Sequence, residues 1–491
     1  MSAPRLPTAL LLLSFLHVAC TDGKRDDTQT GDDTQGGDDT DTQGDTDTTG
    51  DTGPNGVEKV VVIGAGLSGL AAARTLHEHD CCEVVVLEAQ DRVGGRISTE
   101  QLPISGDIVE ASAQYHMGPR DSSLTPVIEE MGIRTEDYLW THESWDYDGS
   151  ENPVSSLDWG RFYDDATLRS RNYADQPDVS LEAMIEEMQV EGAFSYLDGD
   201  REIGYCVSTL FEEEYSSDAS EMRAWSLWEG DDLFGNDQWF PDGMEAIPEY
   251  LAEGLDVRLS TPVTAVQYDD QGVTVSTQTG ETFSAERVVV TVSLGVLKAG
   301  DIEFDPSLPS TNTDAIARLG MGLMDKVWLV FPEIFWDPDI DFKGFASEPS
   351  GQYASWNYWG GNALLVWHAG SNARTLEFKP DEEIIQGAMD TLRLMYGDDI
   401  PEPTETLISR FDHEAVDAIS GATPRSTYTK GSYSFLALGS TPDDRAAIAT
   451  PVDDRVFFAG EHTNQTHPAL LQGAYDSGVR EANNIIELLE E

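Results

Sequence analysis

The sequence predicts an α/β fold built around a parallel sheet, and two observations early in the chain support this prediction. Residues 59–63, Lys-Val-Val-Val-Ile, form an almost continuous apolar run, as expected of a strand that is buried on both faces. After a glycine-rich turn, residues 70–78 repeat their apolar side chains at helical spacing, and a second apolar run occupies 83–87. Strand, helix and strand follow one another as in a βαβ unit.

The turn between the first strand and the helix contains Gly64, Gly66, Ser68 and Gly69. Bare backbone and a helix N-terminus at this point can face a pyrophosphate, so the turn predicts a Rossmann-like dinucleotide site. Glu88 ends the second strand, nineteen residues after Gly69. A carboxylate there can accept hydrogen bonds from both ribose hydroxyls and argues against a 2′-phosphate.

A second glycine pair follows this carboxylate. Gly94 and Gly95 lie between Arg92 and Arg96, which suits another close approach of backbone and guanidinium to a pyrophosphate or to the edge of a flavin. Together with Glu88, these residues resemble the extended signature of flavoproteins related to glutathione reductase, particularly the flavin amine oxidases. The resemblance implies bound FAD and a glutathione reductase-type FAD-binding domain with an interleaved α+β substrate domain.

Four later stretches extend the resemblance, and two of them imply catalytic residues. Lys326 lies in the family's lysine motif, where the lysine holds a water near flavin N5. A buried amine would lose part of its charge, which suits a proton acceptor or an oxygen-activating group. Tyr433 matches one wall of the family's aromatic cage for amines. Leu470 falls at the other wall, and Tyr115 replaces a tryptophan of the segment beneath the flavin.

The remaining residues implied by the resemblance contact the cofactor. Val263 matches the position that touches adenine through its backbone, and Gly460 and Glu461 match the step beside the ribityl-phosphate arm. The next helix points its N-terminus toward the pyrimidine ring, which would stabilise a reduced anionic flavin. Ser432 stands where monoamine oxidases carry the cysteine that bonds to flavin. FAD is therefore expected to bind without a covalent link.

The function implied is an FAD-dependent amine oxidase. It would transfer hydride from the alpha carbon of a primary or secondary amine, a polyamine or monoamine, to flavin N5. The imine would hydrolyse, and O2 would reoxidise the flavin and give H2O2. An L-amino acid oxidase is the main alternative, because Arg120 could clamp a carboxylate. A lipid or carotenoid desaturase and a catalytically silent flavin-binding surface protein are further alternatives. No cluster with metal-ligand spacing occurs in the sequence, so no metal is expected.

The N-terminus has the charged start and short apolar run of a secretory signal, and residues 1–19 are interpreted as a signal peptide. Cleavage after Ala19 would free Cys20 for lipid attachment, as in bacterial lipoproteins; plain secretion and an uncleaved anchor are the alternatives. Residues 20–56 repeat Asp, Thr and Gly without an apolar period and are predicted to be a disordered acidic tether. The protein is therefore expected to be exported, and to touch a membrane only through its lipid.

The formal net charge is −62, and residues 57–491 hold 80 acids against 26 bases. So acidic a surface repels phosphates, which argues against nucleic acid as a partner. A salty environment would screen the self-repulsion, and the same field would steer cationic amines toward the protein. Both interpretations remain open.

The predicted domains are discontinuous. The FAD-binding domain comprises residues 57–130, 241–300 and 425–491, and the substrate-binding domain comprises 131–240 and 301–424. Within the latter we expect a helix at 181–188, strands at 326–331 and 363–368, and an insertion at about 412–424 that reshapes the mouth of the active site.

Overall fold

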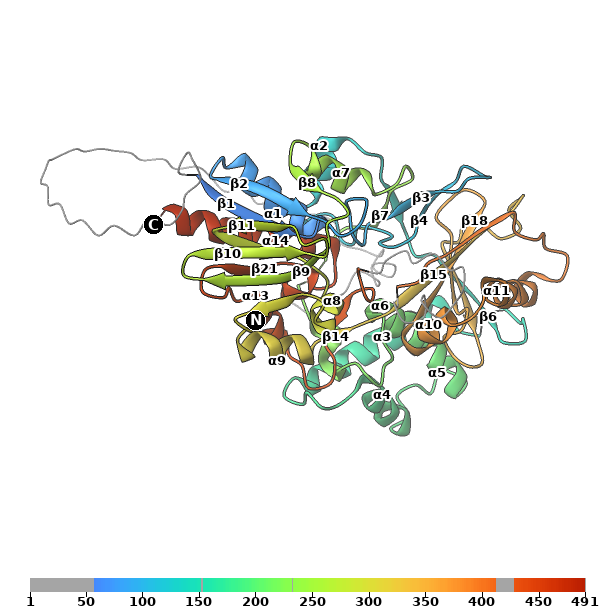
Figure 1. The fold of residues 1–491 in the computed structure, drawn as a ribbon. Helices are drawn as coiled ribbons and strands as arrows, with labels where there is room; N and C mark the ends of the chain where they lie inside the picture. The colour runs from blue at the N-terminus through green and yellow to red at the C-terminus, as the bar shows by residue number, and fades with distance from the viewer. Residues whose placement is uncertain (1–56, 152, 232, 412–427, 491) are drawn as a thin grey trace, which may run out of the picture.

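The computed structural model describes residues 57–151, 153–231, 233–411 and 428–490. The predicted signal peptide, the tether with Cys20 and the insertion at 412–424 lie outside these residues. Figure 1 shows the nucleotide-type βαβ unit at one end of the molecule and a second sheet, backed by helices, at the other. No helix among the described residues is long and apolar enough to cross a membrane.

A parallel five-stranded sheet forms the centre of the first part, in the order β21-β12-β1-β2-β8. Alternate residues of β1 face different layers: Val60 and Val62 pack against helices, and Val61 and Ile63 pack against a second sheet. This burial on both faces explains the apolar run. The strands are β1 Glu58–Ile63, β2 Cys82–Leu87, β8 Asp256–Arg258, β12 Arg287–Val290 and β21 Val456–Phe458.

The two faces of the parallel sheet are covered differently. On one face α1 (Leu67–Glu78) packs along α14 (Leu471–Glu490), which brings the two ends of the described chain together. The other face carries a four-stranded sheet in the order β11-β10-β9-β13. Its strands are β9 Val263–Asp269, β10 Gly272–Thr277, β11 Thr282–Ala285 and β13 Glu303–Asp305; α8 Leu294–Ala299, α9 Ser310–Arg318 and α13 Pro442–Ala449 lie beside it.

A six-stranded sheet in the order β19-β15-β18-β17-β16-β6 builds the second part. One face packs on α10 (Gly370–Glu377) and α11 (Asp381–Tyr396), and the other face looks back toward the nucleotide-type part. The strands are β6 His142–Asp146, β15 Met324–Val330, β16 Phe342–Ala346, β17 Ser355–Asn357, β18 Ala363–Ala369 and β19 Glu405–Ile408. The expected strands at 326–331 and 363–368 are therefore confirmed to within two residues.

A helical layer with an aromatic core lies below both parts in Figure 1. It contains α3 Ser156–Ser170, a 3-10 turn at Arg171–Tyr173, α4 Leu181–Val190, α5 Asp200–Val207, a π-helical turn at Ser208–Glu212, α6 Glu213–Tyr215 and a 3-10 turn at Ala224–Trp228. The helix expected at 181–188 is α4. The remaining elements are short: α2 Thr125–Met131, α7 Ala246–Ala252, a 3-10 turn at Glu461–Thr463, and the pairs β3 Thr99–Gln101 with β4 Ile108–Glu110, β5 Glu136–Tyr138 with β7 Asp237–Trp239, and β14 Gly320–Met321 with β20 Ser434–Phe435.

All strands of the parallel sheet come from the three segments predicted for FAD binding. However, β13 and α9, from the segment assigned to the substrate-binding domain, pack against β9 and α13. The exact division into two domains stays a prediction.

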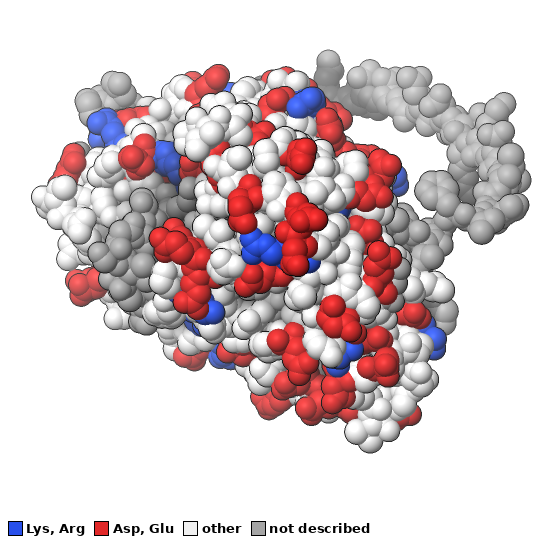
Figure 2. Space-filling model, turned by 90° about the vertical axis from the view of Figure 1, so that its right-hand side faces the viewer, with Lys and Arg blue, Asp and Glu red and all other residues white. Residues whose placement is uncertain are grey.

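The acidity of the sequence appears directly on the surface. In Figure 2 Asp and Glu spread over the whole visible face, and Lys and Arg form only isolated patches between them. Several surface cations are engaged in exposed ion pairs with acidic neighbours, for example Arg134 with Asp242. The surface field seen by an approaching molecule is therefore strongly negative.

Candidate active site

A cavity of about 440 Å3 lies between the parallel sheet, the six-stranded sheet and the helical layer. It contacts most of the residues that the sequence singles out. These are Gly64, Gly66, Ser68, Glu88, Gly94, Gly95, Arg96, Tyr115, Val263, Lys326, Tyr433, Gly460, Glu461 and Leu470. Gly69 and Arg92 do not line it.

The glycine turn forms a cradle at one end of the cavity. Gly66 is the N-cap of α1, and a Cβ on it would meet no atom within 4 Å, because its α-carbon faces the open cavity. Gly69 has the opposite environment, since a Cβ there would lie 2.0 Å from the carbonyl oxygen of Gly64. Gly66 therefore leaves room for a ligand, and Gly69 is needed for packing inside the turn.

Glu88 closes this cradle. One carboxylate oxygen accepts from the Ala65 amide at 2.6 Å, and the other accepts from the Gln90 amide at 2.8 Å. Burial raises the pKa of Glu88, against the effect of these two hydrogen bonds. Each oxygen keeps a lone pair for a further donor, so the carboxylate can still accept from a ribose.

The second glycine pair lies against the first turn, because the Gly94 amide donates to the Ala65 carbonyl at 2.8 Å. Arg92 does not point to the cavity. Its guanidinium donates to the carbonyls of Val93, Gly95 and Ile97 at 3.0, 2.7 and 2.8 Å. In this structure the side chain holds the loop that carries the glycines, and its contact with a cofactor stays a prediction.

Arg96 starts a buried chain of charged groups. It donates to Glu461 at 2.8 Å and to the Ser432 carbonyl at 2.8 Å, and the second oxygen of Glu461 accepts from Ser434 at 2.5 Å. Burial alone would raise the pKa of Glu461, but Arg96 and the other neighbouring cations outweigh it and lower the pKa to about 2. Glu461 is therefore ionised at the cavity wall.

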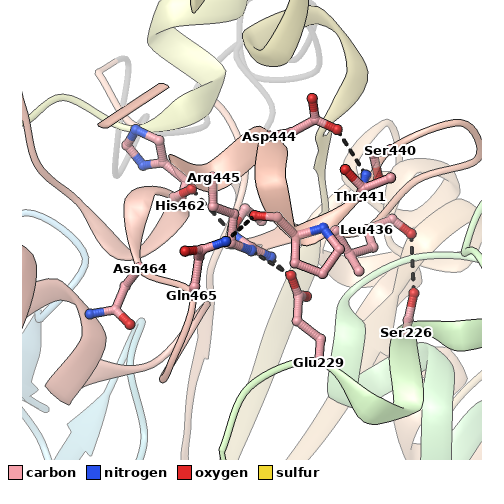
Figure 3. A network of polar contacts seen from close by, with 12 residues as sticks. Ser226, Glu229, Leu436, Ser440, Thr441, Asp444, Arg445, His462, Asn464 and Gln465 are labelled. Atoms are coloured by element: carbon pink, nitrogen blue, oxygen red, sulfur yellow. Dashed lines mark hydrogen bonds and ion pairs between the residues drawn. The ribbon is translucent and has the colours of Figure 1, made fainter. Parts of the chain in front are cut away.

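The chain continues from Ser434 to Arg445 on α13, which donates to that hydroxyl at 2.7 Å. Figure 3 shows the Arg445 guanidinium directed at Glu229, to which it donates twice, at 2.6 and 3.0 Å. Glu229 follows the 3-10 turn Ala224–Trp228 of the helical layer and also lines the cavity. Arg445 thus joins the helical layer to the C-terminal segment that carries Glu461.

Removing Arg445 should be far more costly than removing a neighbouring exposed arginine. Arg445→Met leaves the carboxylate of Glu229 buried without its partner, for which we expect a loss of about 3–5 kcal/mol of unfolding free energy. Arg318 pairs with Asp444, one residue away on α13, but is 45% exposed, and the buried Asp444 keeps its hydrogen bond from the Thr441 amide, so Arg318→Met should cost only about 1 kcal/mol. Denaturant unfolding of both variants measures the difference. Equal losses would contradict the role of burial.

Lys326 lies on β15 on the same face as Trp328, toward the cavity. Its Nζ donates to Gln114 Oε1 at 2.7 Å and to the Glu110 carbonyl at 3.3 Å, and the residue is only 4% exposed. Burial lowers the pKa of Lys326, and the nearby carboxyl of Glu110 opposes this shift in part. Burial therefore shifts Lys326, at the wall of the cavity, toward its neutral form.

Aromatic side chains form the wall opposite the nucleotide cradle. The ring of Tyr115 stacks on Trp359 with centroids 5.5 Å apart, and Trp140 and Trp367 lie 5.8 and 6.4 Å from it. The Tyr433 hydroxyl donates to the Glu213 carbonyl at 2.6 Å, which fixes its ring at the cavity.

Several further residues line the cavity that no sequence motif predicts. Trp140, Trp367, Glu214 and Asp237 all line the cavity. The aromatic residues carry no motif, and Glu214 stands in a run of three glutamates in a chain with 91 acids, so no local signal separates these residues from others of their type.

Comparison with known proteins decides the family. The profile described as flavin containing amine oxidoreductase matches residues 67–486. Polyamine oxidase 4 of Oryza sativa subsp. japonica is 32% identical over 446 residues, covering 86% of this chain and 88% of the relative. The chain belongs to the flavin-containing amine oxidoreductases. The family resemblance seen in the sequence, the Rossmann-like α/β fold and the enzyme class are thereby confirmed.

Other relatives of this oxidoreductase are larger. Lysine-specific histone demethylase 1 homolog 3 of the same plant is 32% identical over 451 residues, which cover 87% of this chain but 54% of the relative. The chain thus spans about half the length of the histone demethylases that it matches. The structure of a putrescine oxidase bound to putrescine superposes with a TM-score of 0.69 at 22% identity, covering 88% of this chain and 99% of that one, and shows the shared fold.

The cavity fits the flavin that the family implies. Gly66 leaves open space at a helix N-terminus for a pyrophosphate, the second glycine loop lies beside it, and Glu88 is placed for a ribose. Arg96, Glu461 and the first turn of α14, with Leu470 just before it, lie farther along the same cavity.

Proposed function

We propose that this enzyme oxidises small cationic amines, primary or secondary, with a non-covalently bound FAD, and that O2 is its electron acceptor. When bound, FAD supplies the hydride acceptor for the alpha carbon of the amine, and the oxidised product hydrolyses to a carbonyl compound. Gly64, Gly66, Ser68, Glu88, Gly94, Gly95, Arg96, Val263, Gly460 and Glu461 would hold it.

The side chains of the cavity support distinct roles. Tyr433, Tyr115 and Leu470 form walls that exclude water and orient the amine, and Trp140 and Trp367 line the cavity beside Tyr115. Lys326 can accept a proton because burial favours its neutral form, and the amide of Gln114 holds its Nζ in place.

The charged side chains that line the cavity favour an amine over an amino acid as the substrate. Among the described lining residues the Lys and Arg side chains are Lys326 and Arg96. Arg96 already binds Glu461, and Lys326 is held by Gln114. Arg120, the candidate carboxylate clamp, is exposed and does not line the cavity. A substrate carboxylate would therefore meet acids and no free cation, which argues against an L-amino acid oxidase.

Anaerobic titration of the yellow, full-length enzyme tests the proposal. Amines should bleach the flavin absorbance, and readmitted air should restore it with release of H2O2. Bleaching by L-amino acids alone would move the assignment to the rival oxidase. A yellow protein that neither class reduces would favour a silent flavin-binding protein or a desaturase. Yellow colour released by acid precipitation supports non-covalent FAD, which agrees with a hydroxyl rather than a thiol at Ser432.

Export and lipid attachment at Cys20 are part of the same proposal. They are supported by the charged start and apolar run of residues 1–19 and by the cysteine that directly follows. The full chain should partition with membranes and the Cys20→Ala variant should not. Equal partitioning of the two would overturn lipidation and leave the amine oxidase assignment intact.

A further inference from the structure

Cys81 and Cys82 lie next to each other where the turn after α1 enters β2, and their sulfur atoms are in contact. The two Sγ atoms are 2.8 Å apart, about 0.8 Å farther than the two sulfurs of a disulfide bond. The other cysteine among the described residues, Cys206, is buried in the helical layer. A short movement of two neighbouring side chains would therefore bring their sulfurs to bonding distance.

The surroundings hold both thiols at the edge of the protein core. The Cys81 thiol donates to the Leu76 carbonyl in the last turn of α1 at 3.7 Å, and Cys82 begins β2 beside Glu58 of β1. Both side chains are half-buried and pack against the apolar cluster between α1 and α14. The fold thus positions the two sulfurs, yet a small oxidant can reach them from the solvent.

The environment of Cys82 disfavours its thiolate. Burial, the neighbouring Cys81 and the carboxylate of Glu286 all raise the pKa of the Cys82 thiol. Because a thiolate is the stronger nucleophile, Cys82 is a poor candidate for the first attack on an oxidant. That attack is therefore assigned to Cys81.

We propose that Cys81 and Cys82 form a redox site that hydrogen peroxide closes to a disulfide. The Cys81 sulfur attacks one peroxide oxygen, the O–O bond breaks, and the departing hydroxide leaves with the thiol proton as water. The Cys82 sulfur then attacks the resulting sulfenic sulfur, the S–O bond breaks, and hydroxide leaves with the Cys82 proton as a second water. Two thiols are oxidised to one disulfide while one H2O2 is reduced. Only one source of this peroxide, amine turnover in air, rests on the proposed function.

The closed disulfide should be easy to reduce again. Neighbouring α-carbons are about 3.8 Å apart across a trans peptide, less than the roughly 4.4–6.8 Å that disulfides usually span, so closure strains the linkage. Strained and accessible disulfides are the labile ones. A dithiol reagent should therefore reopen the site, which makes the oxidation reversible.

Mass spectrometry of the full-length holoenzyme tests the site. Trypsin should release both cysteines in one peptide, residues 75–92, and Cys206 in another, residues 202–223. In the reduced, denatured enzyme N-ethylmaleimide should label Cys81 and Cys82. After H2O2 treatment the 75–92 peptide should take up no label and weigh about 2 Da less than the unlabelled reduced peptide, and dithiothreitol should restore both labels. A peptide that keeps both labels, or that gains oxygen without losing hydrogen, overturns the proposal.

Two variants test which sulfurs pair. Cys206→Ser removes a buried thiol of the helical layer, so H2O2 should still close the site as in the wild type. Cys82→Ser leaves Cys81 without its partner, so H2O2 should add oxygen to the 75–92 peptide and remove no hydrogen. If Cys206→Ser abolishes closure, the assignment of the pair is wrong.

The same samples separate this inference from the proposed function. Cys82 and Glu88 stand at opposite ends of β2, about 20 Å apart at about 3.3 Å per residue, so closure should leave flavin bleaching by amines unchanged. An open site after added H2O2 overturns the inference and leaves amine oxidation intact. A closed site in a protein that no amine bleaches supports the inference and overturns the proposed function.

Amine turnover in air should also close the site, and added catalase should prevent this closure. If turnover releases H2O2 and the site stays open, oxidation by the enzyme's own product is wrong.

Discussion

Replacing Lys326 by methionine should slow turnover by about 10²- to 10⁴-fold, the usual contribution of a positioned acid or base. Methionine keeps an unbranched apolar chain in the space beside Trp328 and removes only the amine that Gln114 holds. Stopped-flow absorbance separates flavin bleaching by anaerobic amine from recovery in air. The half-reaction whose rate falls is the one that uses the amine of Lys326.

Lys343 provides a matched control in the same sheet. It lies on β16, is completely buried, and burial lowers its pKa to about 8, but it does not line the cavity. Lys343→Met should therefore affect stability and leave both half-reactions of the folded protein nearly unchanged. Equal slowing by the two substitutions would show that Lys326 acts through structure and not through its amine.

The step in which Lys326 accepts a proton should depend on pH in a defined direction. As a proton acceptor Lys326 is active when neutral, so activity rises as pH increases through its pKa, which burial places below the ordinary value of 10.5. The carboxylate of Glu110 favours the charged lysine. Glu110→Gln should therefore move this rising limb to lower pH, and a shift to higher pH would contradict the coupling. Lys326→Met should lack the limb altogether.

The second large effect is expected at the glycine cradle. Gly66→Val should abolish FAD binding, raising the dissociation constant more than about 100-fold, because the new side chain would occupy the open space at the helix N-terminus. The backbone of Gly66 has φ −74°, which a residue with a side chain can adopt, so the apoprotein should still fold. Titration with FAD, followed by absorbance, measures the loss. Unfolding of the apoprotein measures its stability.

Gly69→Ala is the contrasting control for Gly66→Val. A Cβ at this position would lie 2.0 Å from the Gly64 carbonyl oxygen, so Gly69→Ala must distort the turn and should destabilise the apoprotein itself. Unaltered FAD affinity in Gly66→Val would contradict the position assigned to the pyrophosphate. An apoprotein equally destabilised by both changes would show that the two glycines have the same structural role.

Much of the nucleotide-type part is encoded in short segments. The apolar runs of β1 and β2, the glycines between them and Glu88 predict strand, turn, helix and carboxylate, because burial on both faces and positive-φ turns leave local signatures. The strands that carry Lys326 and Trp367 are predictable for the same reason. A local pattern predicts which side of a strand is buried, but it does not predict which residues pack against that side.

The contacts that determine the charges at the cavity join residues far apart in the chain. Arg92 and Arg96 flank the same glycine pair, yet one folds onto its own loop and the other reaches Glu461, 365 residues away. Glu229 meets Arg445 across 216 residues, and of the three consecutive glutamates Glu213 and Glu214 line the cavity whereas Glu212 does not. Sequence periodicity therefore established the fold and the cofactor cradle, whereas the partners of each charge, and hence the chemistry of the amine pocket, arose from the packing of distant segments.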